Sequence, residues 1–182
     1  MSRVQIIIIG VFISLASSVR GNDSQQLFLT PYILDGKIQE ARDLAVVKPF
    51  LENVKSYSGF ITINEIYKSH VFFWFFTSTT EWTTAPLIVY LQGGLGVTFM
   101  YGLFTGNGPY ILEGDQLDYK RYSWTDHFNV LYIESPVGTG FSFIELEGGY
   151  STNLTQVGED LHDFTTVLNS ISWATEESTN TC

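Results

Sequence analysis

Cysteine and basic residues are both scarce in this chain. Its one cysteine is Cys182, the last of the 182 residues, so no disulfide can form within the sequence and the core has to be stable without one. Nine Lys and Arg residues stand against nineteen Asp and Glu residues, which gives a net charge of −10 at pH 7. Because phosphate contacts need clustered basic side chains, we expect no nucleic acid as a partner.

Long apolar runs are absent after the first fifteen residues. The run over residues 4–15 follows Arg3 and is shorter than the roughly 20 residues that a membrane span needs. Small residues then lead to Gly21, and this order is typical of a secretory signal peptide. We predict a signal peptide over residues 1–21, cleaved after Ser18 or Gly21, and no membrane span. The protein would then be secreted or lysosomal/vacuolar; a buried first strand or helix is the alternative.

Residues 22–173 have the length and apolar content of one domain, and the polar, unpatterned residues 174–182 predict a disordered tail. Two Asn-x-Ser/Thr triplets, at Asn22 and Asn153, are candidate glycosylation sites behind a signal peptide. Asn153 is the better candidate, because Asn22 would lie beside the new N-terminus. No metal-ligand spacing is present, so we expect neither a metal nor another cofactor.

Apolar periodicity predicts an α/β fold with a strand hairpin, buried strands and one long amphipathic helix. Alternation over residues 57–63 and a continuous apolar run over 70–77 predict the hairpin, and runs at 87–91 and 129–133 predict two more buried strands. Residues 35–47 could form a short helix. From Leu154 to Ile171, apolar residues recur with the spacing of one helix face, and Asn153 and Gln156 resemble an N-cap and its N3 partner.

The strand predicted at residues 87–91 runs directly into a glycine-rich turn, Gln92-Gly93-Gly94-Leu95-Gly96. Adjacent glycines allow a backbone to approach a ligand closely, and amide groups at such a turn can stabilise a developing oxyanion. Two glycines alone equally fit a tight turn without a ligand. The turn by itself therefore leaves both interpretations open.

Five blocks of the sequence resemble serine carboxypeptidases. They are residues 55–60, 72–76, 91–94, 102–104 with Gly108-Pro109, and 136–142, which reads Pro-Val-Gly-Thr-Gly-Phe-Ser. The strongest resemblance is to the vitellogenic carboxypeptidase-like branch, and the blocks extend from about Leu29 to Ile171, corresponding to the front part of a family member. The resemblance implies the N-terminal part of an α/β-hydrolase fold, incomplete in this chain.

The same resemblance implies release of C-terminal residues from peptides in an acidic compartment, through a Ser-Asp-His triad and an acyl-enzyme. Carried over by position, Gly94 would donate to the oxyanion. Gln92 and Gly93 would hold the terminal carboxylate of the peptide. Peptide C-termini are thus the expected partners.

Several residues depart from the family pattern. Leu95 replaces a proline of the turn, and Val97, Thr98 and Phe99 replace a small residue and two serines, so that a large ring stands at position 99 where a hydroxyl is expected. Gly106 replaces an acid that helps to bind the substrate carboxylate in the family. These changes predict a weakened site.

No catalytic triad can be assigned within the 182 residues. The pattern Gly-x-Ser-x-Gly is absent, and His70, His127 and His162 are interpreted as surface or boundary residues. Three hypotheses follow. The chain is a truncated and inactive family member, or a non-catalytic secreted glycoprotein that binds peptides or a partner, or an enzyme that uses Ser135 or Ser142 by another route. We rank the third last, and we expect the isolated chain to be poorly soluble because its sheet would have unpaired edges.

Overall fold

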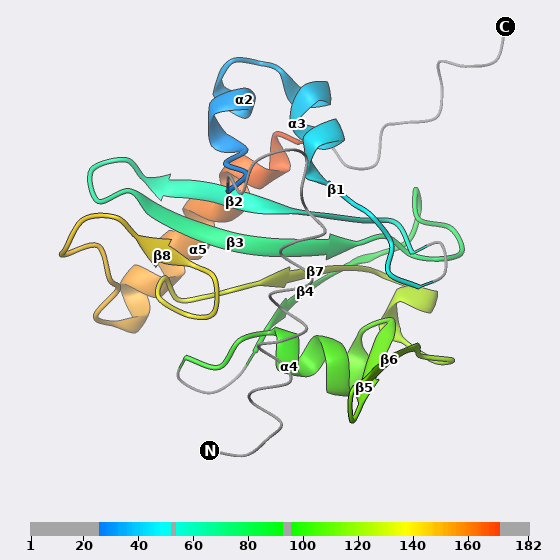
Figure 1. The fold of residues 1–182 in the computed structure, drawn as a ribbon. Coiled ribbons are helices and arrows are strands. Elements are labelled where there is room, and N and C mark those ends of the chain that lie inside the picture. The colour runs from blue at the N-terminus through cyan, green and yellow to red at the C-terminus, as the bar shows by residue number, and fades with distance from the viewer. Residues whose placement is uncertain (1–25, 52–53, 93–95, 172–182) are drawn as a thin grey trace, which may run out of the picture.

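The computed structural model describes residues 26–51, 54–92 and 96–171, and in these residues a mixed six-stranded sheet forms the centre of the fold (Figure 1). The order across the sheet is β1 (Val46–Val47), β2 (Ser56–Asn64), β3 (Ser69–Phe76), β7 (Asn129–Ile133) and β4 (Leu87–Leu91), with β8 (Phe143–Ile144) paired to the beginning of β3. β2, β3 and β7 are antiparallel neighbours, whereas β4 and β7 run parallel.

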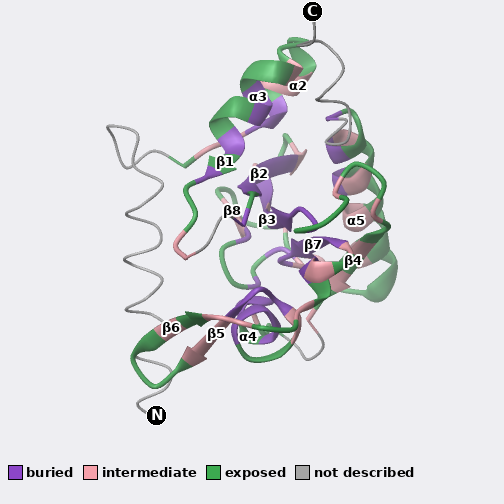
Figure 2. Ribbon diagram, turned by 90° about the vertical axis from the view of Figure 1, so that its right-hand side faces the viewer, coloured by how far each residue is buried: buried purple, intermediate pink, exposed green. Residues whose placement is uncertain are grey.

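Side chains that alternate along β3 belong to two separate core layers. Phe73 and Phe75 lie in the layer formed with α3 (Ile38–Ala45) and α5 (Leu154–Asn169). Trp74 and Phe76 lie in the opposite layer, with residues of α4 (Met100–Gly102), the π-helix η1 (Leu103–Asn107) and β5 (Tyr110–Glu113). The sheet is therefore covered on both faces, which explains the continuous apolar run of β3 (Figure 2).

The strands predicted at residues 57–63, 70–77, 87–91 and 129–133 are confirmed as β2, β3, β4 and β7. The predicted long helix is α5, and Asn153 is its N-cap, because Asn153 Oδ1 accepts a hydrogen bond from Gln156 N at 3.0 Å. Gln156 Oε1 in turn accepts from Thr152 N at 2.7 Å, one residue before the cap. Leu154 was expected on the apolar face, yet it is 88% exposed.

Two local predictions were incomplete. The helix predicted over residues 35–47 is the shorter α3, Val46–Val47 form the short edge strand β1, and a further short helix, α2 (Thr30–Leu34), precedes α3 where none was predicted. A second hairpin, β5 with β6 (Gln116–Tyr119), lies between the strands predicted at residues 87–91 and 129–133, where no strand was predicted. Its turn is Gly114-Asp115, a dipeptide that favours two-residue hairpins and that could have revealed it.

The prediction that β4 is a buried strand is wrong for one of its faces. Leu87, Val89 and Leu91 are 54, 48 and 42% exposed. β4 is the last strand of the sheet in the described residues, and α5 packs against β2 rather than against β4. The poor solubility expected from such an edge stays a prediction.

In the described part of the chain, no helix combines the length and apolarity needed to cross a membrane.

Candidate active site at the ends of β4 and β7

Parallel pairing of β4 and β7 brings together two residues that are remote in the sequence. Leu91 and Ile133 are register partners at the carboxyl ends of the two strands. Gln92 and Glu134, which immediately follow them, therefore lie at the same edge of the sheet, where ligands bind in open α/β sheets. Gly93, Gly94 and Leu95 lie outside the described residues, so the oxyanion role predicted for Gly94 and the carboxylate contact predicted for Gly93 remain predictions.

Gln92 is held in place by a tyrosine of the same strand. The Tyr90 hydroxyl donates a hydrogen bond to Gln92 Oε1 at 2.7 Å. Gly102 of α4 lies directly against both groups, and a Cβ atom at this position would overlap the Tyr90 hydroxyl. The bond between Tyr90 and Gln92 fixes which way the amide of Gln92 is turned.

Thr98 and Phe99 bind the carboxyl group of Glu134. This group is fully buried; Glu134 Oε1 accepts a hydrogen bond from the Thr98 hydroxyl, and Glu134 Oε2 accepts one from Phe99 N at 3.4 Å. Burial raises the pKa of Glu134 to about 7, and the two hydrogen bonds partly offset that rise because they favour the ionised form. No motif in the sequence marks Glu134, which is a lone acid after a predicted strand.

The ring of Phe99 does not project into the site, contrary to the expectation from the sequence. Phe99 is fully buried and stacks on Phe72, with ring centroids 6.1 Å apart and planes 6° apart. It also contacts Tyr132 at 5.4 Å between ring centroids. The substitution at position 99 therefore changes the core, while Thr98 still supplies a hydroxyl group at the end of the turn.

The block at residues 136–142 surrounds Glu134 from the other side. Ser142 Oγ donates to the Glu134 carbonyl oxygen at 2.7 Å and accepts from Phe72 N at 2.8 Å. Gly140 lies against the Glu134 carboxyl group so closely that a Cβ atom would overlap it, and its φ is 54°. Because the hydroxyl of Ser142 is buried and bonded to backbone, the structure argues against Ser142 as a nucleophile.

There is free space at Gly106, the position where the family pattern has an acid. A Cβ atom on Gly106 would have no other atom within 4 Å, and Lys120 Nζ donates to the Gly106 carbonyl oxygen. The next residue, Asn107, accepts a hydrogen bond from the Tyr132 hydroxyl at 2.9 Å. The backbone thus leaves room for the acid that the sequence lacks.

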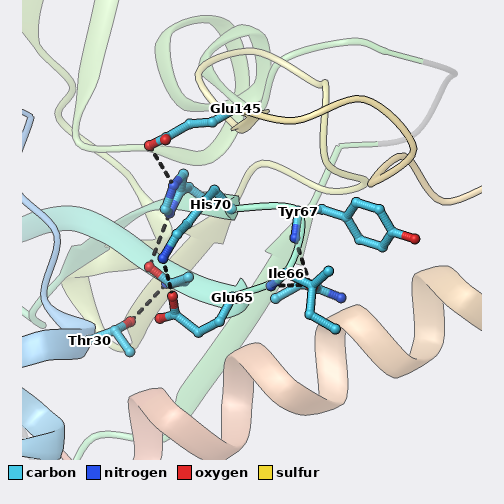
Figure 3. A network of polar contacts seen from close by, with 9 residues as sticks. Thr30, Glu65, Ile66, Tyr67, His70 and Glu145 are labelled. Carbon is cyan, nitrogen blue, oxygen red and sulfur yellow. Dashed lines mark hydrogen bonds and ion pairs between the residues drawn. The ribbon is translucent and has the colours of Figure 1, made fainter.

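The three histidines lie in different surroundings. His127 and His162 are exposed, whereas His70, the second residue of β3, is only 4% exposed and is therefore not a surface residue. Figure 3 shows His70 between its polar partners: Nδ1 lies 3.0 Å from Thr62 Oγ1, and Nε2 lies 3.3 Å from Glu145 Oε1. Its ring packs between Phe28 and Phe143, so its surroundings are those of a core residue that links β3 to β2 and β8.

The mixed sheet and the helices on both of its faces define a partial α/β-hydrolase fold. A solved structure of Kex1(Δ)p, a prohormone-processing carboxypeptidase from Saccharomyces cerevisiae, matches with a TM-score of 0.57 and 27% identity, covering 65% of this chain and 28% of that one. The family model for serine carboxypeptidases (peptidase S10) matches residues 47–169. The chain belongs to the serine carboxypeptidase family.

Curated relatives show the same relationship at higher identity. The venom serine carboxypeptidase of Apis mellifera is 53% identical over 75% of this chain and 30% of its own length. The probable serine carboxypeptidase CPVL of Homo sapiens is 46% identical over 84% of this chain and 33% of its own length. The vitellogenic carboxypeptidase of Aedes aegypti is 44% identical over 79% and 31%, respectively. The chain thus spans about a third of the length of these relatives.

Proposed function

We propose that this chain carries the substrate-binding part of a serine carboxypeptidase site and binds the C-terminal carboxylate of peptides. In this proposal, Gln92 and Gly93 hold the carboxylate and the amide of Gly94 faces the oxyanion. The observation that carries the proposal is the hydrogen bond from Tyr90 to Gln92 at the end of β4, because it fixes an amide side chain at the edge of the sheet where α/β folds bind their ligands.

Hydrolysis by this family's route needs a nucleophile, a base and an acid, and no motif in these 182 residues assigns them. No Gly-x-Ser-x-Gly pattern is present, and Ser142 is committed to the backbone of β3 and β7. We therefore propose that the 182-residue chain does not cleave peptides by itself. An acyl-enzyme would require a nucleophile and a base brought to the Gln92 edge of the sheet.

A non-catalytic role as a secreted, glycosylated peptide-binding protein is the alternative. It is favoured by Gly106, which removes an acid from the expected carboxylate site, and by Asn153, whose exposed side chain uses only its oxygen for the helix cap. Both proposals share the peptide-binding step and differ in whether a complete triad ever acts on the bound peptide.

The binding step is tested with one pair of ligands and one pair of variants. We expect a dipeptide with a free carboxylate to bind more tightly to the chain than its C-terminal amide, as measured by calorimetry. Gln92→Ala should weaken binding of the free acid by roughly tenfold, the usual effect of losing a hydrogen bond to a charged group. Gln116→Ala, on the exposed strand β6, is the matched control. Equal binding of acid and amide would reject the proposal.

The catalytic step is tested separately. We expect no hydrolysis of a blocked dipeptide at pH 5 by the 182-residue chain. Hydrolysis that is abolished by a serine-directed phosphonate would show that the chain contains a nucleophile after all.

A further inference from the structure

Glu134 is the one buried acid among the described residues, and the proposed peptide-binding step does not use it. A carboxyl group without exposure costs free energy unless its oxygens are hydrogen-bonded. Here both oxygens are bonded, and both donors come from one short segment, Thr98 and Phe99, that immediately follows the glycine turn. The fold has thus placed its buried acid where it binds that segment.

Thr98 connects the carboxyl group to the helix that follows. Its hydroxyl oxygen, which donates to Glu134, also accepts a hydrogen bond from Met100 N at 3.2 Å at the beginning of α4. α4 contains Gly102, the residue packed against the Tyr90 and Gln92 side chains. A continuous set of contacts therefore leads from Glu134 through Thr98 and α4 to Gln92.

The other side of Glu134 is fixed by the sheet. Its amide donates to the Phe72 carbonyl oxygen at 3.0 Å, and its own carbonyl accepts from Ser142 Oγ. Gly140 leaves no free space beside the carboxyl group. The backbone of Glu134 is therefore held by β3 and Ser142, and its carboxyl group is enclosed between Gly140 and the Thr98–Phe99 segment.

We propose that Glu134 is a positioning residue: it anchors the Thr98–Phe99 segment and, through α4, holds Gln92 in the orientation that binds a peptide carboxylate. This inference rests on the proposed function for its effect on peptide binding. The anchoring itself does not depend on that function and can be measured alone.

The test uses two disrupting variants, one conservative variant and one matched control in the full 182-residue chain. Thr98→Val removes the hydroxyl at constant shape, and Glu134→Gln replaces one of the two acceptor oxygens with an NH2 donor, so that only one of the two hydrogen bonds keeps an oxygen acceptor. Thr98→Ser keeps the hydroxyl. Thr105→Val, in η1, removes a hydroxyl that bonds to the Tyr101 carbonyl oxygen and not to Glu134.

Amide hydrogen exchange at Phe99 and Met100 is the readout for anchoring. We expect roughly tenfold or greater acceleration in Thr98→Val and Glu134→Gln, with amides of β2 and β3 unchanged, because only a local opening becomes easier. The Phe99 protection factor of the wild type should change with pH near 7, and that of Glu134→Gln should not. Thr98→Ser and Thr105→Val should behave as the wild type. Unchanged exchange at Phe99 and Met100 in both disrupting variants, or equal acceleration throughout the sheet, would overturn the anchoring role.

Affinity for the dipeptide with a free carboxylate is the readout for positioning. We expect Thr98→Val to weaken binding several-fold and Thr98→Ser to restore it. If Thr98→Val binds the dipeptide as tightly as the wild type although its Phe99 amide exchanges faster, the positioning role of Glu134 is rejected. Its anchoring role then still stands. If the wild type binds neither the free dipeptide nor its C-terminal amide, the proposed function is rejected. The role of Glu134 in positioning Gln92 is then rejected as well. Hydrogen exchange still tests separately whether Glu134 anchors Thr98 and Phe99.

Discussion

The Thr98 hydroxyl donates a hydrogen bond to the buried carboxyl group of Glu134, and this contact joins the residue that follows β7 to the segment before α4, 36 positions away in the sequence. The substitutions at positions 98 and 99 look equivalent in the sequence, but their side chains lie in different surroundings. Thr98 retains a hydroxyl group where the family has serine, while Phe99 directs its ring into the core. The substitution at position 99 therefore changes the core, and the substitution at position 98 keeps a hydroxyl group.

Restoring the family residue at position 99 should destabilise the chain. Phe99→Ser would leave a cavity beside Phe72 and Tyr132, and we expect a loss of about 3 kcal/mol or more in the free energy of unfolding, as for other large-to-small core changes. Urea denaturation measures it. Phe141→Ser is the matched control, because Phe141 is 38% exposed and should cost much less. Equal losses for the two variants would contradict the core position of Phe99.

Restoring the acid at position 106 should be tolerated. Gly106→Glu places a Cβ atom in open space, so we expect the free energy of unfolding to change by no more than about 0.5 kcal/mol. A carboxyl group there should bind the peptide carboxylate better when protonated, so dipeptide affinity should rise as the pH falls from 7 to 5. Gly102→Ala is the contrasting variant, because its Cβ atom would overlap the Tyr90 hydroxyl and the side chains of Tyr90 and Gln92 would have to shift. Gly106→Glu with wild-type pH dependence would show that position 106 lies away from the bound carboxylate.

Glu134 should make the chain more stable in acid than at neutral pH. Its pKa is raised from the ordinary 4.5 to about 7 in the folded chain, so the folded state binds the proton more tightly than the unfolded state. The stabilisation is complete below pH 4.5, is lost as the pH rises to about 7 and is roughly 3 kcal/mol at most. Glu134→Gln should flatten this part of the profile of unfolding free energy against pH, whereas the exposed control Glu113→Gln should not. An unchanged profile in Glu134→Gln would contradict the raised pKa.

His70 should act in the opposite direction. Burial lowers the pKa of His70 from its ordinary 6.5, and the hydrogen bond and charge of Glu145 partly offset this effect. The folded state therefore favours the neutral ring, and this stabilisation is lost as the pH falls through the lowered pKa. NMR titration of the ring protons should give a midpoint below 6.5, and Glu145→Gln should lower it further. Glu147→Gln, two residues away, is the control; a midpoint that does not fall in Glu145→Gln would contradict the contact.

Asn153 can be tested as a helix cap and as a glycosylation site independently. Thr155→Ala removes the Asn-x-Thr triplet and keeps the cap, and Asn153→Asp removes the acceptor amide while keeping an oxygen for Gln156 N. Asn153→Ala removes both and should cost about 1 kcal/mol of unfolding free energy in unglycosylated protein. In secreted protein, all three variants should lose the same glycan mass by mass spectrometry. Retention of that mass in Thr155→Ala would assign the glycan to another residue.

Local patterns of the sequence determined most of the secondary structure and the family. The apolar run of β3 and the helical spacing of α5 arise from which faces must be buried, and that requirement is present within each segment. β2 also alternates in sequence, although both of its faces are buried over most of its length. The five sequence blocks that resemble serine carboxypeptidases likewise lie within single segments. The β5–β6 hairpin was missed although its Gly-Asp turn is a local signal.

Only the tertiary structure decided which of these segments contact one another. Parallel pairing of β4 with β7 placed Glu134 beside Thr98, the stacking on Phe72 turned Phe99 inward, and the strand order left one face of β4 exposed. None of these outcomes is encoded in a local period, because each depends on which distant strand or helix becomes the neighbour. The sequence alone identified the chain's family and its glycine-rich motif; the packing of the sheet decided which side chains surround Gln92 and the Thr98–Phe99 segment.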